Sequence, residues 1–394
     1  MDRKKIREDT PCGNIYMNHA STSVPPLPVI EAAQDYYRMI MQYGATSRKA
    51  EEITIRTCRQ AAENMAAFLN ADAGEIMFVP NGTMGIGMVA QGMPWKPGQN
   101  ILIDSMSFIS NVAPFIEAAK SHGLEIRYIP ARLPGFLDLE KLEELIDENT
   151  ALISVTHAAN SLGVLQDIER IGSLAGKYKI PYLVDAAGTL GAVSLDVQKI
   201  GCDFLSASGR KYLRGPSGTG ILYVRQERIG MLKGYMPAWN SGTWDYGTEE
   251  FTYHNDIRRL EFGEKNYPGI FGLSKAVEYI SEIGGMRRIE ARIRELTGYL
   301  LDRLEAVDGI RILGPGEAAC RCGTTGFIVE GKGCEEIAGY LNKNGVGMMA
   351  HHFFCPGVSE LFEIEGTARL SVHYWNTEEE IDTVINLLKK MQGE

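Results

Sequence analysis

The chain has 394 residues, of which 44% are hydrophobic and 23% are charged, a balance typical of globular proteins. Its formal net charge of -10 argues against nucleic acid or an anionic membrane surface as the main partner. No stretch approaches the roughly 20 apolar residues that a membrane span needs, so we expect no membrane partner.

The cysteines and the N-terminus indicate a reducing compartment. The seven cysteines include no C-x-x-C pair, which argues against a zinc ribbon and against a disulfide framework. The first ten residues, MDRKKIREDT, are charged and no apolar run follows them, so they do not resemble a signal peptide. We therefore expect a cytoplasmic protein.

Short apolar runs alternate with amphipathic runs from about residue 75 to residue 225. A helical face at 55–69, with apolar residues spaced by three and four, precedes them. Near-continuous apolar strands that alternate with helices predict a largely parallel sheet with helices on both faces. The predicted strands are 75–79, 100–104, 125–129, 151–157, 181–187, 203–208 and 220–224, with helices at 111–122 and 138–149 among them.

The pattern changes after about residue 265, where long charged helices and short strand candidates follow one another. We therefore predict an α/β protein with a large domain at 15–265. A smaller α+β domain would be built from 1–14 and 266–394. Its predicted elements are helices at 286–307 and 376–392 and strands at 325–330 and 368–374.

Ligands of open α/β sheets bind beyond the carboxyl ends of the strands, so the polar residues there are the first candidates for a site. The first predicted strand runs through Asn81, Gly82 and Thr83 into a helix. Free N–H groups at a helix N-terminus, with a threonine hydroxyl, can bind an anion. An ordinary turn with a helix cap has the same sequence pattern.

Two further strand ends carry a polar residue. Asn160 follows the strand at 151–157 and is on its own an ordinary turn asparagine. Asp185 ends the apolar run YLVD, where a nearly buried carboxylate needs a cationic or hydrogen-bonded partner. It is either a helix cap or the partner of a protonated heterocyclic nitrogen, and the sequence leaves both open.

The segment SASGRK (206–211) adds Ser208, Arg210 and Lys211. Serine and arginine can both bind phosphate, and a partly buried lysine has a lowered pKa that makes it a nucleophile and a base. A solvated basic pair is the alternative. Together, the four strand ends supply a phosphate site, a carboxylate, an asparagine and a lysine, which is the set that pyridoxal 5′-phosphate (PLP) requires.

With these motifs in place, the sequence resembles the class V aminotransferases of the fold type I PLP enzymes. That group includes cysteine desulfurases, selenocysteine lyases and isopenicillin N epimerase-like proteins. The resemblance covers nearly the whole chain, from residue 16 to the C-terminal helix. Its motifs are YMNHASTS, FVPNGTMGIG, THAANSLGVLQDI, YLVDAAGTLGA, SASGRKYLRGPSGTGILYV, RRLEFGEKNYPGIFGL and TARLSVHYWNTEEEID.

The resemblance implies a role for each matching residue. Lys211 would bond covalently to the cofactor, Asp185 would pair with its pyridine nitrogen, and Asn160 would hydrogen-bond its phenolic oxygen. Arg369 would bind the substrate α-carboxylate. His19 lies in a segment that enters the active site in this family, and a structural role for it is equally open. The implied phosphate ligands are Gly82, Thr83, Ser208 and Arg210.

Four positions depart from the desulfurase pattern. Phe108 stands where desulfurases have a histidine stacked on the cofactor, and a phenyl ring stacks but relays no proton. Gly188 replaces a glutamine or histidine after the cofactor aspartate. Arg210 replaces a histidine and adds a permanent charge. Glu264 replaces a threonine that reaches the phosphate of the neighbouring subunit.

Cys355 is the candidate sulfur carrier. Its segment MMAHHFFCPGV (348–358) is similar to the histidine-pair-then-cysteine segment of one desulfurase group, but two phenylalanines shift the register. A persulfide carrier must be a mobile thiolate, and we favour the alternative of a half-buried loop cysteine. His351 and His352 have no third ligand in view, so we predict no metal site.

The resemblance implies a PLP enzyme that acts on an amino acid. Desulfuration or C–S lysis of a cysteine-like substrate is the first expectation, because desulfurases and lyases look most similar. The alternatives are an aminotransferase or epimerase and, more distantly, a non-catalytic protein on a PLP fold. We also expect a homodimer, with 239–246 (WNSGTWDY) as a candidate contribution to the partner's site, and a sulfur acceptor protein if the enzyme is a desulfurase.

Overall fold

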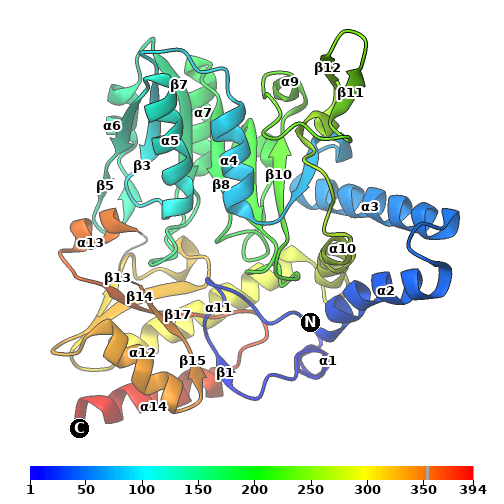
Figure 1. Cartoon of the computed structure of the whole chain (residues 1–394). Coiled ribbons are helices and arrows are strands. Elements are labelled where there is room, and N and C mark those ends of the chain that lie inside the picture. Colours follow the sequence, from blue (N-terminus) through cyan, green and yellow to red (C-terminus); the bar gives the residue numbers. More distant parts are fainter. Residues whose placement is uncertain (352–354, 394) are drawn as a thin grey trace.

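A seven-stranded sheet forms the centre of the computed structural model, which describes residues 1–351 and 355–393 (Figure 1). Its strands lie in the order β2-β10-β9-β8-β7-β3-β4. All neighbours are parallel except β10, which is antiparallel to both β2 and β9. The strands are β2 (Ile76–Val79), β3 (Asn100–Asp104), β4 (Glu125–Ile129), β7 (Thr150–Thr156), β8 (Tyr182–Asp185), β9 (Phe204–Ser208) and β10 (Gly220–Val224).

Helices cover both faces of this sheet, because its strands alternate between two apolar cores. In β3, Ile101 and Ile103 belong to the core under α4 (Gly82–Gly92) and α5 (Ala113–His122). Leu102 belongs to the opposite core, together with residues of α3 (Arg48–Leu69) and α7 (Ile168–Tyr178). The predicted α/β fold with a mostly parallel, doubly covered sheet is confirmed.

A second sheet of four antiparallel strands lies toward the C-terminus, in the order β13-β14-β17-β16 (Figure 1). Its apolar face packs on helices in a core of its own. The strands are β13 (Ile310–Leu313), β14 (Thr324–Val329), β16 (Met349–His351) and β17 (Thr367–Ser371). The helices are α11 (Met286–Glu305), α12 (Cys334–Lys343) and α14 (Glu378–Gly393).

The N-terminal segment packs against the C-terminal part of the chain. β1 (Ile15–Tyr16) pairs with β15 (Val346–Gly347), and Asn18 forms a bridge with Ser371. α2 (Leu27–Tyr43) then packs on α10 (Tyr267–Glu282). The division into domains 15–265 and 1–14 plus 266–394 stays a proposal.

The remaining elements are short. The helix predicted at 138–149 is confined to α6 (Leu139–Leu145). None of the helices in the described part of the chain is both long and apolar enough to cross a bilayer. The other elements are α1 (Arg3–Glu8), α8 (Val197–Ile200), α9 (Gln226–Ile229), α13 (Pro356–Phe362), β5 (Ala131–Arg132), β6 (Phe136–Leu137), β11 (Gly242–Asp245) and β12 (Glu250–Tyr253).

The position of α4 depends on a close contact with β9. A Cβ atom added to Gly85 would lie 2.3 Å from Ser206 Oγ and 3.2 Å from Ser206 Cβ. The Ser206 hydroxyl also donates a hydrogen bond to the Gly82 carbonyl at 2.8 Å. The first turn of α4 is therefore held at the carboxyl end of β9.

We expect Gly85→Ala to destabilise the protein by about 1 to 3 kcal/mol, because overpacking here must displace Ser206 or the helix. Gly87→Ala is the matched control, since a Cβ at Gly87 in the same helix meets nothing within 4 Å. Alanine there should be neutral or stabilising by up to about 1 kcal/mol. Urea unfolding measures both, and equal stability of the two variants would contradict the packing argument.

Candidate active site

A cavity of about 760 Å³ lies beyond the carboxyl ends of the central strands. Its wall combines the start of α4, the turn after β3, the ends of β7, β8 and β9, and the N-terminal segment 18–22. This is the edge at which an open α/β sheet binds ligands. All eight predicted cofactor-binding residues line it: Gly82, Thr83, Phe108, Asn160, Asp185, Ser208, Arg210 and Lys211.

Lys211 and Asp185 are the central ionisable pair of this cavity. Burial lowers the pKa of Lys211 to about 8, while the neighbouring Asp185 opposes that shift. Burial raises the pKa of Asp185, whose Oδ1 accepts a hydrogen bond from the Ala187 N–H at 2.9 Å. A fraction of Lys211 is therefore neutral near pH 7 and able to act as a nucleophile or base.

The first turn of α4 lies in the cavity wall. Asn81 caps the helix, and its Oδ1 accepts from the Met84 N–H at 2.9 Å. The Gly82 N–H points to Ser208 Oγ at 3.4 Å, and the Thr83 hydroxyl donates to Ser110 Oγ at 2.8 Å. Because the helix N-terminus carries partial positive charge, this group of donors suits a phosphate.

Arg210 lines the same cavity, and its guanidinium binds the N-terminal segment. It donates a hydrogen bond to the Ser21 carbonyl. Its own carbonyl accepts from the Ser23 N–H at 2.8 Å. In this structure, Arg210 thus ties the N-terminal segment to the turn that carries Lys211.

Phe108 lies in the wall above a buried polar network. The Lys211 Nζ atom is 6.0 Å from the centre of the Phe108 ring. Asp104 Oδ2 accepts from the Ser107 hydroxyl at 2.5 Å and from the Thr156 N–H at 2.7 Å. These bonds fix the turn that carries Phe108 to the end of β7.

Sequence reasoning missed Asp104, although a signal for it was present. Asp104 ends the apolar run NILID as Asp185 ends YLVD, and both carboxylates are buried at strand ends. Burial raises the pKa of Asp104 to about 6 against the opposing hydrogen bonds from Ser107 and Thr156.

Arg369 is fully buried behind the wall and is not among the residues that line the cavity. Its Nη1 donates to the Asn160 carbonyl at 2.9 Å and to Asn160 Oδ1 at 2.8 Å. Its Nη2 donates to Asn18 Oδ1 at 2.9 Å and to the Ser21 hydroxyl. Burial lowers the pKa of Arg369 to about 10, so it stays protonated at neutral pH.

His19 does not reach the cavity. It is fully buried, and its Nδ1 lies 2.7 Å from Ser23 Oγ. Its Nε2 lies 3.2 Å from both the Tyr16 carbonyl and Asn376 Oδ1. Burial lowers the pKa of His19 to about 3, so the ring is neutral and enclosed by protein.

Cys355 is also outside the cavity wall. It is buried in the apolar core just before α13, more deeply than the half-buried loop position favoured from the sequence. Burial raises the pKa of its thiol to about 11, so it is protonated at neutral pH. His352 lies outside the described residues. Among the side chains that the structure describes, which do not include that of His351, no three from His, Cys, Asp or Glu are grouped to bind a metal.

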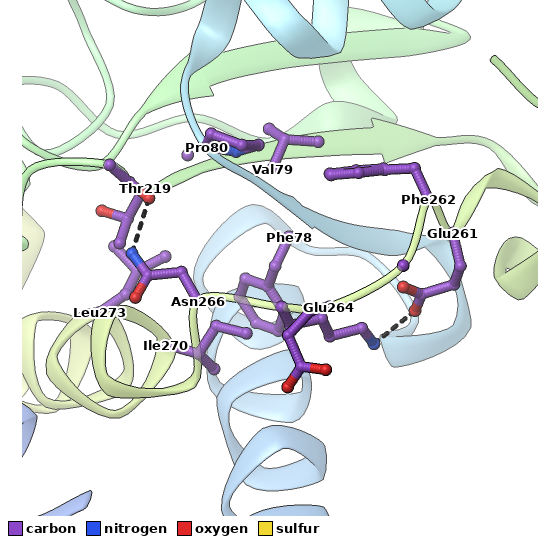
Figure 2. A pocket seen from close by; sticks show the side chains of 14 residues that line it. Phe78, Val79, Pro80, Thr219, Glu261, Phe262, Glu264, Asn266, Ile270 and Leu273 are labelled. Carbon is purple, nitrogen blue, oxygen red and sulfur yellow. Dashed lines mark hydrogen bonds and ion pairs between the residues drawn. The ribbon is translucent and has the colours of Figure 1, made fainter. Parts of the chain in front are cut away.

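The segment 260–266 borders a second, much smaller cavity of about 40 Å³ (Figure 2). This cavity shares Pro80 and Gly218 with the large one. Lys265 forms an ion pair with Glu261 at its edge, while the side chain of Glu264 is exposed. Glu264 therefore stays outside the large cavity of its own chain.

A family model described as Aminotransferase class-V matches residues 15–384. The chain belongs to this family. A probable cysteine desulfurase of Methanothermobacter thermautotrophicus is 32% identical over 100% of this chain and 99% of its own length.

Two solved structures are also similar to this chain. The apo structure of a cysteine desulfurase from Thermococcus onnurineus NA1 superposes with a TM-score of 0.91 at 28% identity, covering 99% of this chain and 98% of that one. The cystine C–S lyase C-DES, solved with cysteine persulfide, has a TM-score of 0.86 at 21% identity over 96% and 98% of the two chains. At that identity, it shows the shared fold alone.

Membership of the class-V aminotransferase family confirms the enzyme class and the PLP cofactor predicted from the motifs. The residues of the cavity fit that cofactor. A nucleophilic lysine, a buried carboxylate and a helix N-terminus with hydroxyl groups face one space. A cofactor with an aldehyde, a basic ring nitrogen and a phosphate requires groups of these three kinds.

Asp104 should make stability depend on pH. Its folded pKa of about 6 lies above the ordinary value of about 3.9, so protonation favours the folded state. This contribution is complete below about pH 4 and is lost as the pH rises through about 6.

Asp104→Asn keeps an acceptor oxygen and does not ionise. From pH 4 to pH 7, its free energy of unfolding should therefore rise relative to the parent by up to about 3 kcal/mol. Urea unfolding across this range measures the difference, and the exposed Asp35→Asn is the control for the substitution itself. A difference that does not change with pH would show that Asp104 is not perturbed.

Proposed function

We propose that this protein uses PLP to cleave the C–S bond of a cysteine-like amino acid. The observation that carries the proposal is the placement of Lys211 and Asp185 in one cavity at the N-terminus of α4. Similarity to cysteine desulfurases along the full chain supports the substrate class. The donor groups of the cavity support a cofactor with a phosphate, an aldehyde and a basic ring nitrogen.

Each part of the cofactor has a matching part of the wall. Lys211 supplies the amine for the covalent link, and Asp185 supplies a negative charge that keeps the ring nitrogen protonated. The amides of the first turn of α4 would bind its phosphate. The other proposed contacts are Thr83, Ser208 and Arg210 at the phosphate, Phe108 on the ring face and Asn160 at the phenolic oxygen.

When bound, PLP supplies an electron-withdrawing ring that stabilises negative charge on the substrate α-carbon. The chain supplies the proton transfers. Lys211 is the proposed base for the α-proton, because its pKa of about 8 leaves a neutral fraction near physiological pH. Phe108 has no proton to give, so general acid–base work falls to Lys211 among the residues named here.

The burial and the pKa of Cys355 bear on whether the substrate sulfur is transferred to the enzyme. A thiol with a pKa of about 11 that is buried in a core is a poor nucleophile and a poor sulfur carrier. We therefore infer that sulfur leaves as a free product and does not pass through Cys355. A sulfur acceptor protein would be required only if a persulfide formed on the enzyme.

The proposal includes a homodimer and a cytoplasmic location. Trp239, Trp244 and Tyr246 around β11 are 75%, 63% and 81% exposed, which suits burial against a second copy. This aromatic segment is the proposed contribution to the partner's site, whereas a glutamate such as Glu264 cannot bind the partner's phosphate unless it is protonated. All seven cysteines are free, as expected in a reducing compartment.

The reaction is tested by product analysis. The PLP-loaded protein is incubated with L-cysteine and with L-cystine, without an oxo acid, and alanine, pyruvate and sulfide are quantified. We expect pyruvate with released sulfur. Lys211→Ala should abolish both the product and the borohydride-trapped link to the cofactor, while the exposed Lys199→Ala keeps both. Alanine as product would make the enzyme a desulfurase, and neither product would favour an aminotransferase or epimerase.

Cys355→Ser should retain turnover within about twofold, because a buried protonated thiol takes no part in the reaction. The steady-state rate is measured beside Cys334→Ser, a half-exposed cysteine of α12 that controls for thiol loss. Lost turnover in Cys355→Ser with normal cofactor absorbance would instead assign a persulfide to Cys355.

A further inference from the structure

Thr156, at the end of β7, lines the active-site cavity together with Asp185. The two residues are direct partners in the register of β7 and β8, which run parallel. Because side chains alternate between the faces of a sheet, residues paired in register point to the same face. The side chain of Thr156 is therefore a neighbour of the carboxylate that is proposed to pair with the ring nitrogen of PLP.

A short series of hydrogen bonds connects Thr156 to the buried Asp104. The Ser107 hydroxyl donates to Asp104 Oδ2 at 2.5 Å, and Ser107 Oγ lies 3.1 Å from Thr156 Oγ1. Asn111 Nδ2 also donates to Ser107 Oγ, at 2.9 Å, while the Ser154 hydroxyl donates to Asn111 Oδ1 at 2.7 Å. All five side chains are buried, so protein groups and not bulk water determine their orientation.

The direction of each bond in this series follows from the number of hydrogens available. Burial, and to a smaller extent the charge of Asp185, raises the pKa of Asp104 to about 6, so at pH 8 Asp104 is ionised and accepts only. Ser107 gives its one hydrogen to Asp104, and its two lone pairs accept from Asn111 and Thr156. Thr156 must therefore donate to Ser107. Toward the cavity, its oxygen acts as an acceptor.

The negative charge of Asp104 strengthens this acceptor. Hydrogen bonds in series polarise one another, and the effect is larger in a buried, low-dielectric environment. The carboxylate of Asp104 thus increases the electron density on Thr156 Oγ1 through Ser107. A polarised hydroxyl oxygen beside a carboxylate suits a cationic N–H donor, because it adds a second acceptor and no second full charge next to Asp185.

We propose that Thr156 is a further cofactor-binding residue, whose hydroxyl oxygen accepts a hydrogen bond from the protonated ring nitrogen of PLP together with Asp185. One N–H group can be shared between two acceptors in a three-centre bond. Ser107 and Asp104 are the positioning residues that orient the Thr156 hydroxyl. The proposal rests on the proposed pairing of Asp185 with the ring nitrogen, but not on which bond of the substrate is cleaved.

The test is a competition between PLP and an analogue in which a C–H group replaces the ring nitrogen. Cofactor-free protein is equilibrated with both compounds at pH 8, and mass spectrometry after borohydride reduction gives the ratio in which they are bound. The two compounds share the phosphate, the aldehyde and the phenolic oxygen, so this ratio reports on the ring-nitrogen position alone. Thr156→Val should lower the ratio of bound PLP to bound analogue about threefold to tenfold, the range for one hydrogen bond.

Three further variants make the result specific. Thr156→Ser keeps the hydroxyl and should return the ratio to within about twofold of the parent protein. Ser107→Ala removes the connection to Asp104 and leaves the Thr156 hydroxyl free to rotate, so it should also lower the ratio. Thr383→Val, at an exposed threonine of α14, is the control for loss of a threonine hydroxyl and should leave the ratio unchanged. A thermal melt of each variant reports its folding separately.

Asp185→Asn separates failure of this proposal from failure of the proposed site. It should lower the ratio more than Thr156→Val does, because it removes the charged partner of the ring nitrogen. If Asp185→Asn lowers the ratio but Thr156→Val does not, or if Thr156→Val weakens both compounds equally, Thr156 does not bind the ring nitrogen. If Asp185→Asn also leaves the ratio unchanged, the proposed pairing of Asp185 with the ring nitrogen is wrong as well.

Discussion

The N-terminus of α4 lies at the carboxyl edge of the central sheet because Gly85 leaves room for Ser206 of β9. This contact places the partially positive amides of α4 beside the ends of β8 and β9, which carry Asp185 and lead to Lys211. Parallel strands end at one edge, so residues far apart in the sequence meet there. Asp104, Asp185 and Lys211 all lie at or just after this edge.

Burial shifts the pKa of four ionisable groups in or beside the cavity toward the neutral form: upward for Asp104 and Asp185, downward for Lys211 and Arg369. Arg210 adds a further cationic group to the cavity wall. The cavity and its surroundings therefore combine two acidic and three basic side chains, although the whole chain carries -10.

The parts of the site that directly follow a strand could be predicted from the sequence. Strand ends such as those before Asn81 and after Asp185 can be read from short apolar runs, and their meeting follows from a parallel sheet. The reversed direction of β10 was not predicted, because the burial pattern of a strand is the same in both directions. The contact of Arg369 with Asn18 was not predicted either, since the two residues are 351 positions apart and no periodic pattern links them.

The N-terminal segment has a consequence for how the enzyme is made. β1 pairs with β15, and Asn18 and Ser21 contact Arg369. The N-terminal segment is synthesised first, so it cannot form these contacts until nearly the whole chain has been made. A nascent chain that ends near residue 265 already contains Lys211, Asp185 and the whole central sheet. It lacks β15 and Arg369, which contact the N-terminal segment that forms part of the cavity wall. Prematurely terminated chains would thus contain Lys211 and Asp185 without the contacts that hold this part of the wall.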